Sequence, residues 1–226
     1  PAAYQEAVGT ATSGSVTVGY DLSGAAYDSV SFSVSGQDGT PYGVAFNNDG
    51  TKMYMTGSVS ASIYQYSLST AFDLSTASYD SVSFSVQSQE TSPRGIDFNN
   101  TGTKMYIVGT TSDSVHQYSL STAFDLSTAS YDSVNFSVSG QDTVPVKVVF
   151  NTNGTKMFIL GHINDSVFQY SISTAFDLST ASYDSVSFAV TSQEAAPLGV
   201  NFNSDGTKMY IIGTGNDTVY QYSTGS

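Results

Sequence analysis

The sequence predicts an all-β protein, a four-bladed β-propeller built from four repeats of 52 residues. Two landmarks recur at this interval, the tetrapeptide Gly-Thr-Lys-Met and the tripeptide Asp-Leu-Ser. The repeat lysines are Lys52, Lys104, Lys156 and Lys208, and the tripeptides begin at Asp21, Asp73, Asp125 and Asp177. No repeat contains a sustained helical period, and a fixed period of this length is typical of propellers, solenoids and arrays.

Each strand of the repeat can be justified from the second copy. Val82, Phe84 and Val86 alternate with serines, which is the pattern of a strand with one buried face. Residues 99–102 form a tight turn that ends in Gly102, because glycine accepts positive φ at little cost. Residues 104–108 are apolar on both faces, as expected for a strand covered on both sides.

The order of the strands within a blade follows from these segments. From the axis outward we expect residues 95–98, 104–108, 115–118 and 134–138. Four short antiparallel strands in about 50 residues match one propeller blade. One phenylalanine per repeat is expected between blades, namely Phe46, Phe98, Phe150 and Phe202.

The ends of the chain predict how the ring closes. Residues 29–34 have the pattern of an outer strand before any inner strand exists, and the last repeat ends after its third strand at Tyr222. The N-terminal strand is therefore expected to complete the last blade and to remove two exposed sheet edges. An open array and a ring shared between two chains are the alternatives.

The expected domain division is a non-repeating segment, residues 1–20, followed by the four-repeat propeller, residues 21–226. Val16, Val18 and Tyr20 alternate like an extra strand, which either caps the ring or pairs with a neighbouring subunit in a homo-oligomer. Because the chain begins at Pro1 rather than Met, we expect a processed, trimmed or partial chain.

Composition narrows the classes of partner. The net charge is −13 with six Lys and Arg, so phosphate backbones are repelled and nucleic acid is disfavoured. The chain has no cysteine, which excludes disulfides and thiolate metal sites. No apolar run approaches the roughly 20 residues of a membrane span, so no membrane insertion is expected. The low-charge, hydroxyl-rich composition favours an extracellular or virion-associated location.

The motif Pro-x-Gly-Val-x-Phe-Asn-x-Asp-Gly-Thr-Lys-Met-Tyr at residues 41–54 resembles the blades of YVTN and NHL-like β-propeller repeats. Residues 64–75 resemble the longer version of that blade found in marine bacterial and phage-encoded repeat proteins. The resemblance extends over about residues 21–224. It implies a propeller architecture and brings no catalytic residues with it, because such folds serve many functions.

The two histidines are weak candidates for catalysis. His116 occupies the repeat position of Tyr64, Phe168 and Tyr220, so that position requires a flat ring and a structural role is expected. His162 begins a loop, where it is an exposed residue or touches a ligand. No further histidine is present, which excludes a histidine-rich metal site.

The acidic residues are mostly repeated, which suits turn capping better than a single asymmetric active site. Three sets recur: the four that begin Asp-Leu-Ser; Asp28, Asp80, Asp132 and Asp184; and Asp38, Glu90, Asp142 and Glu194. The third set has an alternative interpretation as a ring of carboxylates that binds Ca²⁺ near the axis.

The four copies differ mainly on one face, which we call the top face. It carries the outer-to-inner connections and the loops between second and third strands. The two cations outside the repeat lysines, Arg94 and Lys147, lie there. The predicted ligand-binding residues are Tyr42, Arg94, Asp97, Lys147, Asn201 and His162. The alternative is drift at tolerant loop positions.

These observations favour a binding or adhesion module that presents its top face to a glycan or protein on a cell or particle surface. It is expected to need no cofactor and not to be an enzyme. A structural assembly subunit, which uses residues 1–20 to pair with a neighbour, is the first alternative. A propeller glycosidase or lyase is the second.

Overall fold

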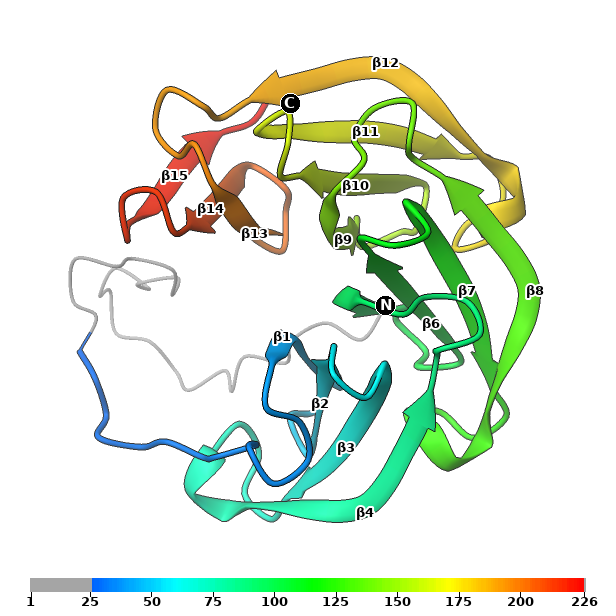
Figure 1. Cartoon of the computed structure of the whole chain (residues 1–226), viewed down its shortest axis with the longest axis vertical. Coiled ribbons are helices and arrows are strands. Elements are labelled where there is room, and N and C mark those ends of the chain that lie inside the picture. The colour runs from blue at the N-terminus through cyan, green and yellow to red at the C-terminus, as the bar shows by residue number, and fades with distance from the viewer. Residues whose placement is uncertain (1–25, 226) are drawn as a thin grey trace, which may run out of the picture.

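A computed structural model describes residues 26–225 of the chain. Their four antiparallel sheets follow one another around a common centre (Figure 1), and we call them blades 1 to 4 in chain order. Blade 1 contains β1 (Pro41–Phe46), β2 (Lys52–Gly57), β3 (Ser62–Leu68) and β4 (Ala77–Ser85). Blade 2 contains β5 (Pro93–Phe98), β6 (Lys104–Gly109), β7 (Ser114–Leu120) and β8 (Ala129–Ser137). Blade 3 contains β9 (Pro145–Phe150), β10 (Lys156–Gly161), β11 (Ser166–Ile172) and β12 (Ala181–Ala189). Blade 4 contains β13 (Pro197–Phe202), β14 (Lys208–Gly213) and β15 (Val219–Ser223).

The predicted all-β, four-bladed propeller is confirmed, and so is the order of strands within a blade. The outer strands begin earlier than predicted, at Ala129 rather than Val134 in blade 2. A one-turn 3₁₀ helix precedes each of them: η2 (Leu74–Thr76), η3 (Leu126–Thr128) and η4 (Leu178–Thr180). Each outer strand contains a bulge at which Ser81, Ser133 or Ser185 has positive φ. The bulge interrupts the alternation of apolar residues, so the sequence pattern did not reveal the half of the strand that precedes it.

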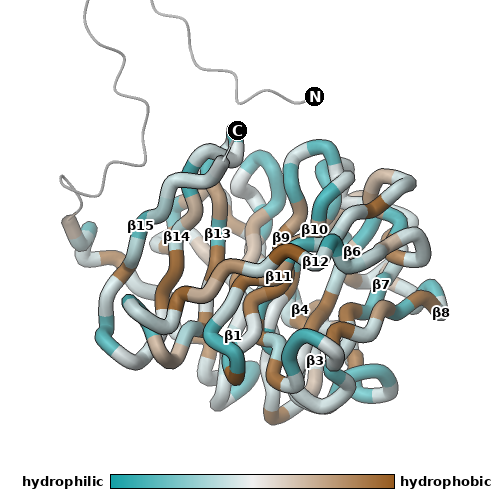
Figure 2. The backbone as a smooth tube through the Cα atoms, turned by 90° about the horizontal axis from the view of Figure 1, so that it is seen from above, coloured by the Kyte–Doolittle hydropathy of each residue, from teal (hydrophilic) through white to brown (hydrophobic). Residues whose placement is uncertain are grey.

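The core lies between neighbouring blades. Tyr54 and Ile63 of blade 1 pack with Ile96, Met105 and Ile107 of blade 2, and all five are fully buried. Blades 2 and 3 share a second cluster, and blades 3 and 4 a third. Figure 2 shows apolar residues along the strands, while hydrophilic residues concentrate in the loops at the two ends. A blade therefore buries its two faces only if it has a neighbour on each side.

The repeated phenylalanines lie at these interfaces as predicted, although each is only half-buried. Phe98 packs on Tyr54 of the preceding blade with ring centroids 4.6 Å apart. Phe150 and Phe202 pack in the same way on Tyr106 and Phe158, at 4.3 and 4.6 Å. Phe46, which has no preceding blade, packs on Phe72 of its own blade at 5.7 Å. Aromatic stacking thus repeats from blade to blade around the arc.

The repeat lysine forms an ion pair that spans three strands of a blade. Lys52 lies 2.7 Å from Asp80, and Lys104–Asp132 and Lys156–Asp184 are each 2.6 Å apart. The lysine on the second strand also donates to a serine on the third, and a glutamine on the third strand donates to the same carboxylate. These aspartates were predicted to cap turns, and that prediction is wrong. Their partner is 28 residues away, so no local pattern reveals it.

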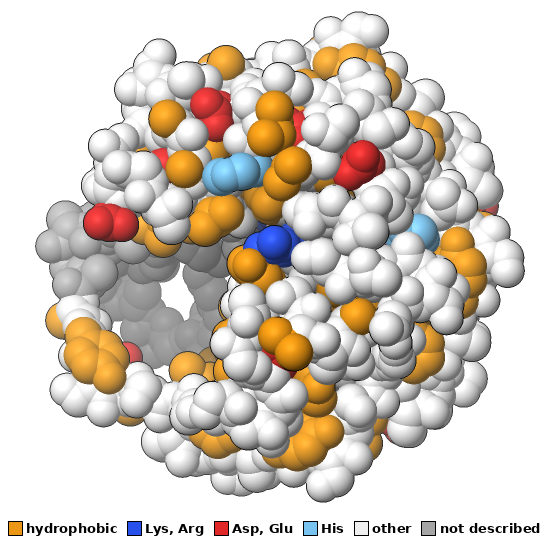
Figure 3. Space-filling model, in the orientation of Figure 1, with side chains coloured by type: hydrophobic (Ala, Val, Ile, Leu, Met, Phe, Trp, Pro, Cys, Tyr) orange, Lys and Arg blue, Asp and Glu red, His pale blue; other side chains and the backbone are white. Residues whose placement is uncertain are grey.

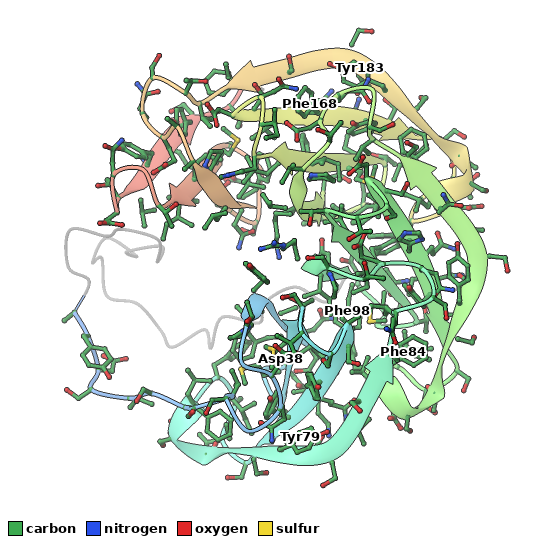
Figure 4. All side chains as sticks on the ribbon, viewed as in Figure 1. Asp38, Tyr79, Phe84, Phe98, Phe168 and Tyr183 are labelled. Atoms are coloured by element: carbon green, nitrogen blue, oxygen red, sulfur yellow. The ribbon has the colours of Figure 1, made fainter. Side chains whose placement is uncertain are left out.

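His116 has the structural role that its repeat position predicts. Its Nε2 lies 2.9 Å from Ser112 Oγ, as the Tyr64 hydroxyl lies 2.9 Å from Ser60 Oγ in blade 1. Its ring packs edge-on against Tyr131, which matches Phe168 against Tyr183 in blade 3 (Figure 4). Burial lowers the pKa of His116, and the nearby Glu90 carboxylate opposes this.

The two ends of the arc differ from the predicted closed ring. Within the described residues blade 4 has three strands, and residues 29–34, expected as its outer strand, are extended but unpaired. Phe32 and Val34 pack instead against the apolar cluster of blade 1, where Phe32 meets Tyr66 edge-on at 5.6 Å. The segment at residues 1–20, with Val16, Val18 and Tyr20, lies outside the described residues, as does Asp21. No helix within residues 26–225 is long and apolar enough to cross a membrane.

Replacing Asp184 with Asn is expected to lower the free energy of unfolding by about 1–2 kcal/mol at pH 7, because Lys156 loses its charged acceptor. Burial alone would raise the pKa of Asp184, but hydrogen bonds from Lys156, Ser171 and Gln169 outweigh burial and lower the pKa to about 2. The stabilisation is therefore fully present above the ordinary value of 3.8 and is lost as the pH falls toward 2. Denaturant titrations at pH 7, 4 and 2.5 measure this, and the exposed cap variant Asp73→Asn serves as control. An equal loss at all three pH values would contradict the ion pair.

Replacing His116 with Phe is expected to remove part of the protein's sensitivity to mild acid. Because the folded-state pKa lies below the ordinary 6.5, the unfolded chain takes up a proton first, and stability falls as the pH drops below about 6.5. Thermal melts between pH 7.5 and 5.5 should show a smaller loss in His116→Phe than in the wild type. The reciprocal variant Phe168→His should gain sensitivity in blade 3. Identical pH profiles for all three proteins would show that the imidazole does not matter.

Candidate binding pocket

The inner strands of all four blades begin at the same end of the molecule with a proline. Proline cannot donate to a ladder and is tolerated on an edge strand, and each inner strand is the edge of its sheet. Pairing with the second strand is irregular just after each proline. This bulge changes the direction of the next side chains relative to the sheet. The residues after the four prolines, Tyr42, Arg94, Val146 and Leu198, line one common pocket.

This central pocket has a volume of about 640 Å³ and draws its lining from every blade. Figure 3 shows lysine and arginine side chains (blue) at the inner edge of an opening between the two ends of the arc. Four of the predicted ligand-binding residues line the pocket: Tyr42, Arg94, Lys147 and Asn201. Their role in binding stays a prediction, but the structure brings them together from four different blades.

Arg94 is stacked on an aromatic ring of the neighbouring blade. Its Cζ lies 3.6 Å from the centroid of the Tyr42 ring, a distance at which a cation is attracted to the ring face. The buried Nε of Arg94 has no hydrogen-bond partner within the described residues. The tyrosine therefore holds the guanidinium in a fixed plane and leaves donors unused.

Thr56 connects the backbones of the two strands that carry this pair. Its hydroxyl donates to the Arg94 carbonyl at 2.9 Å and accepts from the Gly43 N–H at 2.7 Å. The same repeat position holds Val108, Leu160 and Ile212. A hydroxyl at an otherwise apolar, buried position is the signal that could have identified Thr56 from the sequence.

Lys147 lies in the same pocket and donates from Nζ to the Ile96 carbonyl of blade 2 at 3.0 Å. Burial lowers the pKa of Lys147, and the charge of Asp97 opposes this. Within the described residues neither Lys147 nor Arg94 forms an ion pair. An ammonium group with one protein acceptor has two further donors, so the pocket holds two cations with unused hydrogen-bonding capacity.

Asp97 was predicted to share a site with these cations; it lies close enough to Lys147 for their charges to interact, but it lines a different pocket. Its carboxylate accepts from the Phe150 N–H of blade 3 at 3.0 Å and from its own neighbour Phe98 at 2.9 Å. It lines a smaller pocket of about 230 Å³ among the inner hairpins, which Asn201 also lines. Burial raises the pKa of Asp97, opposed by Lys147 and by these two N–H groups. Asp97 thus joins two blades.

His162 lies apart from both pockets. It follows β10, and its Nδ1 is 3.1 Å from the Pro197 carbonyl of blade 4, where it connects a loop of blade 3 to the next inner strand. Tyr210 lines the central pocket but was not among the predicted residues. Its counterparts Tyr54 and Tyr106 donate to carbonyls of the following blade, at Phe124 and Phe176. Tyr210 belongs to the last repeat, which has no following blade, and this position could have shown from the sequence that its surroundings differ.

The third set of repeated acids holds loops together. Asp38 (Figure 4) accepts from Thr40 N at 2.8 Å, from Ser60 N at 2.9 Å and from Ser60 Oγ at 2.8 Å. Glu90, Asp142 and Glu194 accept from the matching loops of their own blades. All four are buried, each inside its own blade, so they do not converge into the ring that the calcium alternative needs. Residues 26–225 contain no group of three or more His, Cys, Asp or Glu placed to hold a metal ion.

The first set of repeated acids caps turns, as predicted. Asp73 accepts from Ser75 N at 2.9 Å at the start of η2. Asp125 and Asp177 accept from the corresponding serines at 2.9 and 3.0 Å. Each of these carboxylates caps the 3₁₀ helix that connects the third strand to the outer strand, so it contributes to the fold. None of the three lines the central pocket.

No protein-family model matches the sequence, and no curated protein matches it. Solved structures do resemble its fold. A candidate 6-phosphogluconolactonase from Bacteroides uniformis superposes with a TM-score of 0.56 at 12% identity, over 80% of this chain and 52% of that one. A similar candidate lactonase from Bacteroides fragilis gives 0.54 at 10% identity, over 81% and 50%. A protein from Lactobacillus plantarum gives 0.57 at 12% identity, over 82% and 54%.

The comparison supports a propeller-like fold, whereas the finer resemblance to YVTN and NHL-like blades has no matching family model. The chain spans about half the length of the solved structures that it matches. Two of these carry the name of an enzyme, the candidate lactonases, and this overturns the expectation from sequence that the protein is not an enzyme. Because identities are 10–12%, the fold is what they share.

Proposed function

We propose that the central pocket binds an anionic carbohydrate. The observation that carries this proposal is the convergence of Arg94 and Lys147 in one pocket. They are the two cations of the sequence outside the repeat lysines, in a chain of net charge −13. Three of the repeat lysines pair with aspartates of their own blades. Arg94 and Lys147 form no such pair, so an anionic ligand is the partner that their charges lack.

The geometry around Arg94 suits a carboxylate or phosphate group. A guanidinium offers parallel donors that match the two oxygens of such a group. Stacking on Tyr42 fixes the guanidinium plane, so less side-chain entropy is lost when the ligand binds. The buried Nε without a partner adds a donor that a ligand can satisfy.

The rest of the pocket suits a sugar ring. Tyr42, Leu198 and Ile212 supply apolar surface, and Asn201 supplies a side-chain amide. A volume of about 640 Å³ lies within the range of small-ligand pockets. The similar candidate lactonases are named for a phosphorylated sugar acid, which is a ligand of the same chemical class. The hydroxyl-rich, low-charge composition favours a location outside the cell or on a virion, where the ligand would belong to a cell or particle surface.

Calorimetric titration with 6-phosphogluconate, glucuronate and glucose tests the proposal. The two acids are expected to bind and glucose is not. Arg94→Ala and Lys147→Ala should each weaken binding of the acids at least about tenfold, or about 1.4 kcal/mol. Arg94→Lys should lose part of the affinity because it keeps the charge but not the paired donors. Affinity should also fall with added salt, since charged contacts are screened.

His162→Ala is the matched control, because that residue lies outside the pocket, and its affinity should equal the wild type's. Folding of each variant is checked by circular dichroism. If the folded double variant Arg94→Ala/Lys147→Ala binds the acids as the wild type does, the pocket is not their site. If none of the acids binds the wild type, the ligand class is wrong.

The same proteins can be tested for hydrolysis of a phosphorylated gluconolactone in a pH-stat. No carboxylate or imidazole among the described residues lines the central pocket, so catalysed hydrolysis there would depend on Arg94 and Lys147. Hydrolysis above the uncatalysed rate that disappears in the double variant would add a catalytic step to this pocket.

A further inference from the structure

The last strand of the arc, β15, is an unpaired sheet edge. The third strands of blades 1 to 3 pair on one side with the second strand and on the other with the outer strand. Within the described residues β15 pairs with β14 alone. Val219 at its start is 47% exposed, whereas its counterparts Ile63, Val115 and Val167 are 0–5% exposed. Such an edge is a template for another strand.

The strand that fits this edge is present at the other end of the chain. Tyr27, Asp28, Val30 and Phe32 occupy the repeat positions of Tyr79, Asp80, Val82 and Phe84 in β4. Ser29 has φ of 58°, and the bulge serines of the three paired outer strands have 58–59°. Non-glycine residues adopt this region rarely. Residues 26–33 therefore carry the side-chain pattern of an outer strand, and Ser29 has the positive φ of its bulge, but the segment has no strand partner among the described residues.

The two residues of the repeat ion pair that remain unmatched lie at the two ends of the chain. Lys208 donates to Ser223 at 2.8 Å, as its counterparts donate to the matching serines. It forms no ion pair within the described residues, although the other three repeat lysines do. The repeat counterpart of their aspartates is Asp28, which is exposed. Lys208 on β14 and Asp28 are thus two halves of one missing interaction.

The chain's own N-terminal segment lies against blade 1, and its described residues do not pair with β15. Phe32 packs on Tyr66 of blade 1, just as Phe84 of β4 packs on Tyr118 of the following blade. Figure 1 shows residues 26–40 beside blade 1 and β15 across the gap between the two ends of the arc.

We propose that β15 of one copy pairs with residues 26–33 of a second copy of this chain. The register follows from blade 3, where Val167 faces Phe188 and Tyr170 faces Tyr183. In the same register Val219 faces Phe32 and Tyr222 faces Tyr27 of the second copy. Lys208 then meets Asp28, and Val219 is covered as in the other blades. Two equivalent seams of this kind relate the two copies by a two-fold axis.

Engineered disulfides test the seam, and the chain has no cysteine to interfere. Ser166 faces Ala189 in blade 3 and Ser62 faces Ser85 in blade 1, so Thr218 should face Ser33 across the seam. Full-length Thr218→Cys and Ser33→Cys proteins are mixed and mildly oxidised. A disulfide-linked heterodimer is expected in the mixture, and its yield should exceed that of the off-register mixture of Thr218→Cys with Ser31→Cys. Ser62→Cys/Ser85→Cys is the positive control and should give an intrachain disulfide.

The double variant Thr218→Cys/Ser33→Cys separates the proposal from closure within one chain. The proposal predicts a covalent dimer. A monomer with an intrachain disulfide, together with no heterodimer in the mixture, would overturn it.

Charge reversal provides a second, reversible measurement by light scattering. The wild type is expected to have twice the 23.8 kDa chain mass. Asp28→Lys alone and Lys208→Asp alone should each weaken the dimer at least about tenfold, because like charges then meet at the seam. The combined variant should recover the wild-type affinity. If either residue only stabilised the fold of its own chain, the combined variant would not recover the dimer affinity of the wild type. A monomeric wild type at 100 µM, or a combined variant weaker than both single variants, would refute the seam.

Discussion

The structure depends on one constraint, that each blade is apolar on both faces and can bury them only against other blades. Tyr54, Ile63, Ile96 and Met105 are fully buried because they lie between two sheets. Their counterparts at the ends of the arc have no such cover: Val44, the counterpart of Ile96, is 53% exposed, and Val219, the counterpart of Ile63, is 47% exposed. The interior of the arc, the exposed surfaces of its two ends and the pocket between its inner strands all follow from this stacking.

The pocket shows how a repetitive scaffold produces an asymmetric site. The inner strands are sheet edges, so their side chains are released from cross-strand pairing on one side. Whatever residue follows each proline therefore faces the centre without disturbing the blade. Tyr42, Arg94, Val146 and Leu198 differ in size and charge, yet the inner strands that carry them all have six residues. Chemistry can change at these positions while the interfaces between blades, which determine stability, are preserved.

Much of the fold could be predicted from the sequence because its signals are local and repeated. Alternation, glycine in the turns and the fixed interval placed nearly every strand, and comparison between copies correctly assigned His116 to packing. The repeat lysine and its aspartate could not be paired in this way, because 28 residues and two turns separate them. Asp97 was grouped with Lys147 from its variability, but its carboxylate accepts from one backbone N–H of the next blade and one of its own strand. The alternating pattern of residues 29–34 identified them as an outer strand. It could not predict where they pack, because that depends on the contact between Phe32 and the distant Tyr66.

The strict register of the repeats also has a consequence for how such a gene changes. Residues 70–81 recur without substitution from Thr122 and from Thr174, so three stretches of the gene, 52 codons apart, encode the same residues in the same reading frame. Unequal recombination between two of these tracts would add or delete 52 codons at once. The product would gain or lose one whole blade, and every remaining blade would still meet a neighbour through the same aromatic stack. In this architecture the size of the ring and the set of residues around its axis can therefore evolve in single steps.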